Sequence, residues 1–388
     1  MSALSFPPGF LWGTATSAYQ VEGGNHASDW WLWERKAGSG CAERSGDACD
    51  HYHRYPGDIE MIADLGFNTY RFSLEWSRIE PEQGEYSRAQ LDHYRRMLES
   101  CHEHGVEPMV TFHHFTSPRW VAAQGGWERP DTAEDFARYC QVAAEHLGDL
   151  FEWAIPINEP NMPPLLGYQD GIFPPGRRDP ATRERVNETF IRAHRLGVEA
   201  IRSGTRARVG MALAMVEMHP VDGGQVELDR IRDVREDVFL AATQDDDFMG
   251  VNAYTRHEVG PEGIRPPRAG AELTGLGWEY RPEALEACVR RAAGVTGKPV
   301  VVTENGIATD HDPQRIAYIT EALRGIHRCL LDGLEVLGYL YWSALDNFEW
   351  NHGYGPKFGL IAVDRATQER TPRPSAQWLG NIARTGAL

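Results

Sequence analysis

The feature that most constrains the fold is a regular alternation of short apolar runs with longer amphipathic stretches. Eight apolar runs can be counted, at residues 10–15, 69–74, 108–112, 153–157, 207–213, 248–251, 299–303 and 338–342. Between them, apolar residues recur every three or four positions at 55–65, 87–104, 132–147, 184–202, 282–293 and 313–331, which predicts helices with one buried face. This alternation is typical of βαβ units and a parallel sheet.

Eight strands favour a closed barrel over an open sheet. No glycine-rich dinucleotide fingerprint follows the first run, and the 388 residues contain no Ser/Gly/Pro-rich linker and no repeat of fixed period. We therefore predict an α/β fold, a single (β/α)8 or TIM barrel domain over residues 1–388, with its active site at the C-terminal mouth of the strands. The fifth run is the weakest, and residues 221–247 after it are acidic and poorly patterned.

Charge and cysteine content exclude several classes of protein. The chain has 56 Asp and Glu against 39 Lys and Arg, so nucleic acid and anionic membranes are not expected as partners. Its six cysteines show no CxxC pair, which predicts free thiols. The N-terminal residues lack a basic segment followed by an apolar one, and no run is long enough to span a membrane, so we expect a cytoplasmic protein.

Two histidine-containing segments look superficially like metal ligands: His51 with His53, and His102 with Glu103 and His104. Adjacent or i, i+2 spacing does not place two ligands on one face of a helix, whereas i, i+4 spacing does. We therefore predict no metal site and no cofactor.

Two glutamates stand where predicted strands end, in WAIPINEP at 153–160 and PVVVTENG at 299–306. Glu159 and Glu304 are poor choices for packing there, because an ionised carboxylate must find partners or stay in water. Either alone could cap a helix or form a structural ion pair. Two carboxylates on separate strands are what glycoside hydrolysis requires: an acid for the leaving oxygen, and a base or nucleophile at the anomeric carbon.

Most of the remaining predicted strands also have polar or aromatic side chains at or just beyond their ends. They include Gln20, Arg71, Glu75, His113, His114, Asn252, Tyr254 and Trp342. In a barrel these positions converge at the C-terminal mouth, where such enzymes place their sites.

The chain also resembles glycoside hydrolase family 1, the β-glucosidase-like retaining enzymes. The resemblance rests on the blocks FLWGTATSAYQVEG, YRFSLEWSRI, TFHHFTSPRW, INEPN, GVNAYTR, VTENG, WSALDNFEW and GYGPKFGL. They occur in the family's order and extend from Phe10 to about Trp378, nearly the whole chain.

The resemblance implies a role for each matching residue. Glu159 would be the general acid/base and Glu304 the nucleophile, with Arg71 and Tyr254 holding Glu304 and Asn252 supporting that wall. The residues that would bind the non-reducing sugar are Gln20, His114, Asn158, Trp342, Glu349 and Trp350. A cation and a hydroxyl donor beside Glu304 would lower its pKa, whereas Glu159 must hold a proton at neutral pH.

Three departures from the family pattern leave the preferred sugar and aglycone open. The chain is shorter than typical members, and we expect the deletion after the fifth strand. Position 115 is Phe where many members have Trp, and SDWWLWE at 28–34 differs from the commoner sequence.

We therefore predict a retaining exo-β-glycosidase that acts on small β-glycosides or oligosaccharides, as a β-glucosidase, β-galactosidase or β-fucosidase. The oligomeric state is left open. One alternative is a 6-phospho-β-glycosidase, although the Glu349 carboxylate would repel phosphate and only Lys357 lies near it in sequence. The other is a catalytically silent barrel that binds sugars or a protein, although both carboxylates are present.

Overall fold

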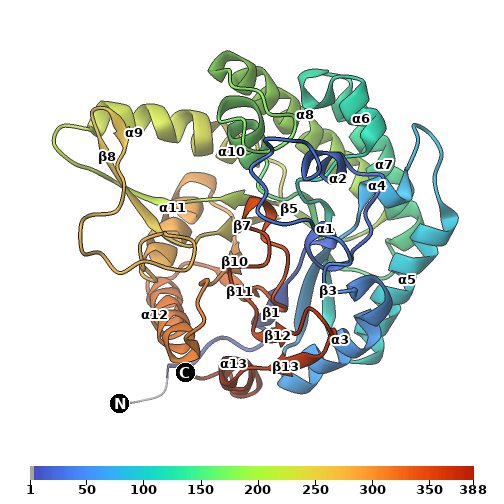
Figure 1. The fold of residues 1–388 in the computed structure, drawn as a ribbon. Helices are drawn as coiled ribbons and strands as arrows, with labels where there is room; N and C mark the ends of the chain where they lie inside the picture. The colour runs from blue at the N-terminus through green and yellow to red at the C-terminus, as the bar shows by residue number, and fades with distance from the viewer. Residues whose placement is uncertain (1–3) are drawn as a thin grey trace.

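Eight parallel strands close into a barrel at the centre of the structure, a computed structural model that describes residues 4–388 (Figure 1). In their order around the barrel they are β1 (Leu11–Ala15), β11 (Val336–Trp342), β10 (Val300–Asn305), β7 (Phe248–Asn252), β5 (Arg208–Ala214), β4 (Trp153–Ile157), β3 (Glu107–His113) and β2 (Thr69–Ser73). β1 pairs with β11 on one side and with β2 on the other, which closes the barrel. The first three residues of the predicted domain 1–388 lie outside the described residues.

The eight apolar runs are the eight barrel strands, so the predicted (β/α)8 barrel is confirmed. Strand ends differ from the prediction by a few residues; β11, for example, begins at Val336 rather than at 338. The fifth run, which is the weakest in sequence, forms the whole of β5 and pairs with both β4 and β7.

Six long helices occupy the predicted positions and surround the barrel (Figure 1). They are α3 (His51–Leu65), α5 (Arg88–Glu103), α7 (Thr132–Leu147), α8 (Pro180–Gly204), α11 (Ala284–Thr296) and α12 (Asp312–Leu331). Apolar residues of these helices and of the outer strand faces form one large buried cluster, which explains the three- and four-residue spacing in the sequence.

The sequence does not predict the shorter elements, because a few residues show no periodicity. The segment 221–247 contains α9 (Gln225–Arg232), the π-helix η3 (Asp233–Asp237) and α10 (Val238–Leu240). The other short helices are α1 (Ala18–Val21), α2 (Asp29–Trp33), α4 (Trp76–Ile79), α6 (Arg119–Ala123), η1 (Gly126–Glu128), η2 (Pro164–Gln169) and η4 (Trp350–His352). The C-terminal helix α13 (Pro374–Thr385) is longer, with 12 residues, and is also absent from the predicted helices.

Two small sheets lie outside the barrel. One contains β6 (Glu217–Pro220), β8 (Arg256–Gly260) and β9 (Gly263–Ile264), and the other contains β12 (Ile361–Val363) and β13 (Arg370–Pro372). The first sheet lies with α9 at one side of the barrel (Figure 1), and its strands come from the segments just before and just after β7.

The inside of the barrel is filled with side chains below the mouth. A cluster that includes Met109, Ile155, Phe248, Val301 and Leu340 is fully buried there. The polar residues of the predicted site lie beyond this apolar layer, toward the C-terminal mouth.

Within residues 4–388, no helix combines the length and apolar character that crossing a membrane requires. That part of the chain also lacks a cluster of three or more His, Cys, Asp or Glu side chains arranged to hold a metal ion. All six cysteines are free, as predicted.

Candidate active site

The structure brings all eleven predicted site residues together at the C-terminal mouth. Eight of them line one cavity of about 350 Å³: Gln20, His114, Glu159, Tyr254, Glu304, Trp342, Glu349 and Trp350. The other three, Arg71, Asn158 and Asn252, are buried and hydrogen-bond to residues of this lining.

Glu304, in β10, is held by a cation and by a hydroxyl group. Arg71 Nη1, from β2, donates to Glu304 Oε1 at 2.6 Å, and the Tyr254 hydroxyl donates to Oε2 at 2.5 Å. Burial raises the pKa of the Glu304 carboxyl, while the Arg71 cation and the Tyr254 hydrogen bond oppose that rise. These two contacts stabilise the ionised form of Glu304.

Glu159 lies just beyond β4 and is fixed by its backbone. Its N–H donates to the carbonyl of Ala212 in β5 at 2.7 Å, and the Asn158 N–H donates to the carbonyl of His113 in β3 at 2.8 Å. Glu159 has a φ of +45°, a left-handed conformation that side chains rarely adopt and that costs on the order of 1–3 kcal/mol. Backbone contacts on both sides of β4 hold this conformation.

The Glu159 carboxyl receives less support for a negative charge. Asn252 Nδ2 donates to Glu159 Oε1 at 2.8 Å, and the cation of the site, Arg71, contacts Glu304 instead. Burial and the charge of Glu304 raise the pKa of Glu159 to about 8. The contacts of the pair therefore favour the negative charge on Glu304 and the proton on Glu159.

Asn158 is oriented by two donors on its oxygen. Arg71 Nη2 and Asn252 Nδ2 both donate to Asn158 Oδ1. The Nδ2 group of Asn158 is therefore available to other partners. Nδ2 lies 3.2 Å from His114 Nε2, and burial together with the nearby Arg71 lowers the pKa of His114 well below its ordinary value. Asn158 thus keeps a donor group directly behind the cavity lining, and His114 presents a neutral ring to the cavity.

Glu349 is buried on the cavity wall with weak partners. Trp342 Nε1 and Gln20 Nε2 donate to its two oxygens, each at 3.3 Å. Burial raises the pKa of Glu349 to about 8, and the charges of Glu304 and Asp346 add to the rise. Long hydrogen bonds to a buried carboxyl leave it able to accept from the hydroxyl groups of a ligand.

Aromatic rings form the wall beside Glu349. The rings of His114 and Trp342 are stacked with centroids 5.7 Å apart, and Trp350 lies nearly parallel to His114 at 6.3 Å. Trp350 is supported from behind by Tyr19 and Trp30. Flat rings beside a carboxyl are suited to the C–H faces and hydroxyl groups of a sugar.

Sequence reasoning missed the outer part of the cavity, which is mainly apolar. Its residues are Met162, Leu166, Ile172, Phe173, Leu276, Trp278 and Phe358. Ile172 and Trp278 are 43% and 36% exposed, so they form an open apolar rim. They lie in loops where no periodic pattern or motif marks them. Phe115, noted in sequence as a departure, also lines the cavity, with a φ of +69°.

Comparison with known proteins identifies one enzyme family over nearly the whole chain. The family model described as Glycosyl hydrolase family 1 matches residues 2–258 and 236–387. A thermostable beta-glucosidase B from Thermobispora bispora is 34% identical over 441 residues, covering 99% of this chain and 92% of the relative. A bifunctional beta-D-glucosidase/beta-D-fucosidase from Bifidobacterium breve is 32% identical over 448 residues, covering 97% of each protein. The crystal structure of beta-glycosidase BGL167 is 48% identical, covers 99% of this chain and 98% of that chain, and has a TM-score of 0.93.

The alignments also show that this chain is shorter than those relatives. Alignments of 441 and 448 positions exceed the 388 residues of the chain, so the relatives carry residues that it lacks. The two family matches overlap at 236–258, a region after β5, where the sequence predicts a deletion.

Replacing Glu159 by Gln should stabilise the fold, and increasingly so as pH rises. The pKa of Glu159 is about 8 in the folded protein against an ordinary value of 4.5, so between these pH values the folded state keeps a proton that the unfolded chain has lost. Rising pH therefore weakens the wild-type fold through this group, and Gln removes the effect. The melting temperature of Glu159→Gln should exceed that of wild type by a margin that widens from about pH 5 to pH 8 and then levels off.

The matched control is Glu60→Gln, because Glu60 is an exposed residue of α3. The melting temperature of this variant should equal that of wild type at every pH. A margin for Glu159→Gln that is absent, or that narrows as pH rises, would contradict the raised pKa.

Proposed function

The chain belongs to glycosyl hydrolase family 1, and we propose that it releases terminal β-D-glycosyl residues by double displacement, with Glu304 as nucleophile and Glu159 as general acid/base. Membership confirms the predicted enzyme class, a glycoside hydrolase. The observation that carries the role assignment is that, of the three buried carboxyl groups lining the cavity, Glu304 alone contacts the Arg71 cation, while Glu159 accepts from the neutral Asn252 amide. We further propose that the two carboxyl groups lie about 5–5.5 Å apart, the separation of retaining enzymes.

In the first step Glu304 attacks the anomeric carbon and the bond to the leaving oxygen breaks. Glu159 gives its proton to that oxygen, so the leaving group departs as a neutral alcohol. The Asn158 amide is placed to donate to the 2-hydroxyl, a contact that strengthens as positive charge develops on the sugar ring. Tyr254 and Arg71 keep the Glu304 carboxylate ionised until it attacks.

In the second step water replaces Glu304 at the anomeric carbon. Formation of the glycosyl ester removes the negative charge of Glu304, one of the two causes that raise the pKa of Glu159. The pKa of Glu159 therefore falls, and its carboxylate can accept a proton from the attacking water. Two inversions at one carbon give a β-sugar as product.

We propose that the inner, polar half of the cavity holds the sugar and the outer, apolar half holds the aglycone. Glu349, Gln20 and Trp350 would contact the sugar, and Ile172 and Trp278 would contact an apolar leaving group. The relatives described as a β-glucosidase and as a bifunctional β-glucosidase/β-fucosidase support glucosides and fucosides as substrates. Glu349 can accept from the 4-hydroxyl in either orientation, so galactosides remain within the proposal.

The comparisons favour neither alternative function. A 6-phosphate would meet the carboxyl of Glu349, and Lys357 is engaged with the carbonyl of Tyr354 at 2.9 Å. The chain retains both Glu159 and Glu304 and belongs to a family of hydrolases, which argues against a catalytically silent barrel.

Alanine variants of the two glutamates should separate their roles. Glu304→Ala should abolish turnover of every substrate, and azide or formate in the vacated space should restore it with an α-configured product. Glu159→Ala should still react with dinitrophenyl glycosides, because dinitrophenolate leaves without protonation, and it should show a burst of dinitrophenolate before slow deglycosylation. For substrates with poor leaving groups, kcat/KM should fall strongly. Azide should then give a β-glycosyl azide.

The readouts are stopped-flow absorbance and the anomeric configuration of the azide products by NMR. Equal losses of Glu159→Ala on activated and unactivated substrates, or azide products with the opposite configurations, would show that the two roles are assigned wrongly.

Glu349→Ala should weaken the transition state for substrates that donate hydroxyl groups to this carboxyl. Above about pH 8, where Glu349 is ionised, a hydrogen bond to it contributes roughly 1.5–3 kcal/mol, so two such contacts predict that the activation free energy for kcat/KM rises by several kcal/mol. The measurement compares nitrophenyl β-glucoside with its 6-deoxy analogue, which serves as an internal control. A smaller loss on the 6-deoxy sugar would place the 6-hydroxyl on Glu349, whereas equal losses would exclude that contact.

A further inference from the structure

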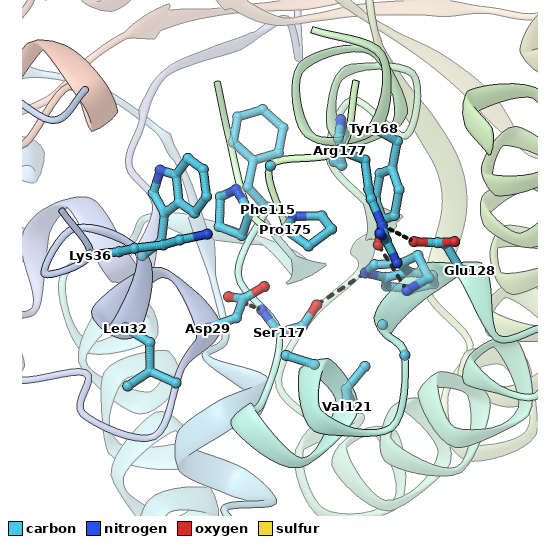
Figure 2. A pocket seen from close by; sticks show the side chains of 18 residues that line it. Asp29, Leu32, Lys36, Phe115, Ser117, Val121, Glu128, Tyr168, Pro175 and Arg177 are labelled. Carbon is cyan, nitrogen blue, oxygen red and sulfur yellow. Dashed lines mark hydrogen bonds and ion pairs between the residues drawn. The ribbon is translucent and has the colours of Figure 1, made fainter. Parts of the chain in front are cut away.

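We propose that a second cavity, beside the catalytic one, binds a neutral carbohydrate ring. The cavity has a volume of about 480 Å³ and lies between α2, the segment after β3 and the segment between β4 and α8 (Figure 2). Its lining contains neither Glu159 nor Glu304, so the proposal goes beyond the catalytic assignment and does not depend on it. Cavities of this size commonly hold small ligands.

Asp29 presents a carboxylate oxygen to this cavity. Its Oδ1 accepts from the backbone N–H groups of Trp30 at 2.7 Å and Ser117 at 3.0 Å. Oδ2 accepts no hydrogen bond from residues 4–388, and Figure 2 shows the carboxyl group directed into the cavity. Burial raises the pKa of Asp29 to about 7, although the residue is only half-buried and lines the open cavity. The hydroxyl groups of a ligand would supply the missing donors.

The charges around the cavity balance one another. Lys36, whose Nζ lies 5.2 Å from the centre of the Trp33 ring, forms no ion pair among the described residues. On the far wall Arg177 Nε pairs with Glu128 Oε1 at 2.9 Å (Figure 2). Above about pH 7, where Asp29 is ionised, two cations and two carboxylates give no net charge, which favours a neutral ligand with several donors and acceptors over an ion.

The remaining walls are flat and apolar. Trp33, Phe115, Trp127, Tyr168 and Pro175 line the cavity, and rings of this kind pack against the C–H faces of sugars. The Tyr168 hydroxyl accepts from the Trp127 N–H at 3.0 Å, which leaves its own hydrogen available as a donor. Aromatic faces together with a free carboxylate oxygen are the groups that carbohydrate recognition uses.

The ligand could come from two sources. Phe115 lines both cavities, so a sugar in the second one could be a distal unit of an oligosaccharide whose terminal unit occupies the catalytic cavity. It could also be a separate sugar molecule. The chemistry is the same in both cases, and the experiments below distinguish them.

A neighbouring pair of alanines offers a matched test. Ala122 and Ala123 are both exposed residues of α6, but only Ala122 lines the cavity. Ala122→Trp should fill the cavity, whereas Ala123→Trp should leave it open. Asp29→Asn is a second probe, because the amide oxygen can still accept from Trp30 and Ser117, while an amide NH2 donor replaces the acceptor oxygen that faces the ligand.

Direct binding is measured with the catalytic cavity filled by a 2-deoxy-2-fluoroglucosyl label. Calorimetric or saturation-transfer NMR titration with glucose and with cellobiose should show a saturable site in labelled wild type and in Ala123→Trp. Ala122→Trp should lose it, and Asp29→Asn should weaken it about tenfold, as expected for loss of a hydrogen bond to a charged group. If the label is found on a residue other than Glu304, the catalytic assignment fails while this titration remains valid.

Steady-state kinetics then identify the source. For a distal unit, Ala122→Trp should lower kcat/KM on β-linked glucose chains of three or more units and leave nitrophenyl glucoside unchanged. For a separate sugar, kcat/KM should be unchanged on every chain length while direct binding is lost. The proposal is overturned if labelled wild type binds no sugar and chain length has no effect, or if Ala123→Trp behaves as Ala122→Trp does.

Discussion

The buried ion pair between Arg71 and Glu304 is the interaction on which the site depends. Burying two charges costs more than their attraction returns unless every donor finds an acceptor. Here each nitrogen of Arg71 is engaged: Nε with Thr111, Nη1 with Glu304 and the carbonyl of Thr303, and Nη2 with Asn158. The pair therefore orients the site and sets its charge, and its contribution to the stability of the fold is secondary.

Closure of the barrel is what makes this pair possible. Arg71 stands on β2 and Glu304 on β10, and β1 and β11 lie between these strands in the closed sheet. The guanidinium thus reaches across the mouth of the barrel. Because it contacts only one of the two carboxyl groups, it favours ionisation of Glu304 over ionisation of Glu159, and this difference supports the proposed roles of nucleophile and acid.

The sequence predicted the barrel and the positions of Glu159 and Glu304 because both follow from strands, whereas Glu349 and Trp350 were predicted only from the resemblance to the family. An apolar run marks a buried strand, and a polar residue at its end marks the mouth, which located Glu159 and Glu304 without coordinates. The fifth strand shows the limit of this reasoning. Its side chains offer no catalytic group, yet the carbonyl of Ala212 holds the backbone of Glu159, and a backbone role leaves no trace in the choice of residue.

Loops account for the other differences. Ile172 and Trp278 form the apolar rim from segments without periodicity, and the left-handed backbone of Glu159, Phe115 and Trp350 depends on tertiary contacts rather than on residue type. The second cavity is likewise formed by loop contacts that no sequence pattern predicts. Asp29 begins a short helix and reads in sequence as an ordinary helix start, and only its placement against Ser117 leaves one oxygen free.

The central claim is that the proton of the buried pair resides on Glu159 while the charge resides on Glu304. Carbon-13 NMR of enzyme labelled at the glutamate side-chain carboxyl, with signals assigned through Glu159→Gln, observes this directly. At pH 7 we expect Glu159 to be protonated and Glu304 to be ionised, and we expect Glu159 to titrate near pH 8. Once a 2-fluoroglycosyl ester forms on Glu304, the pKa of Glu159 should fall. An ionised Glu159 beside a protonated Glu304 at pH 7, or a Glu159 pKa unchanged by the ester, would contradict the central claim.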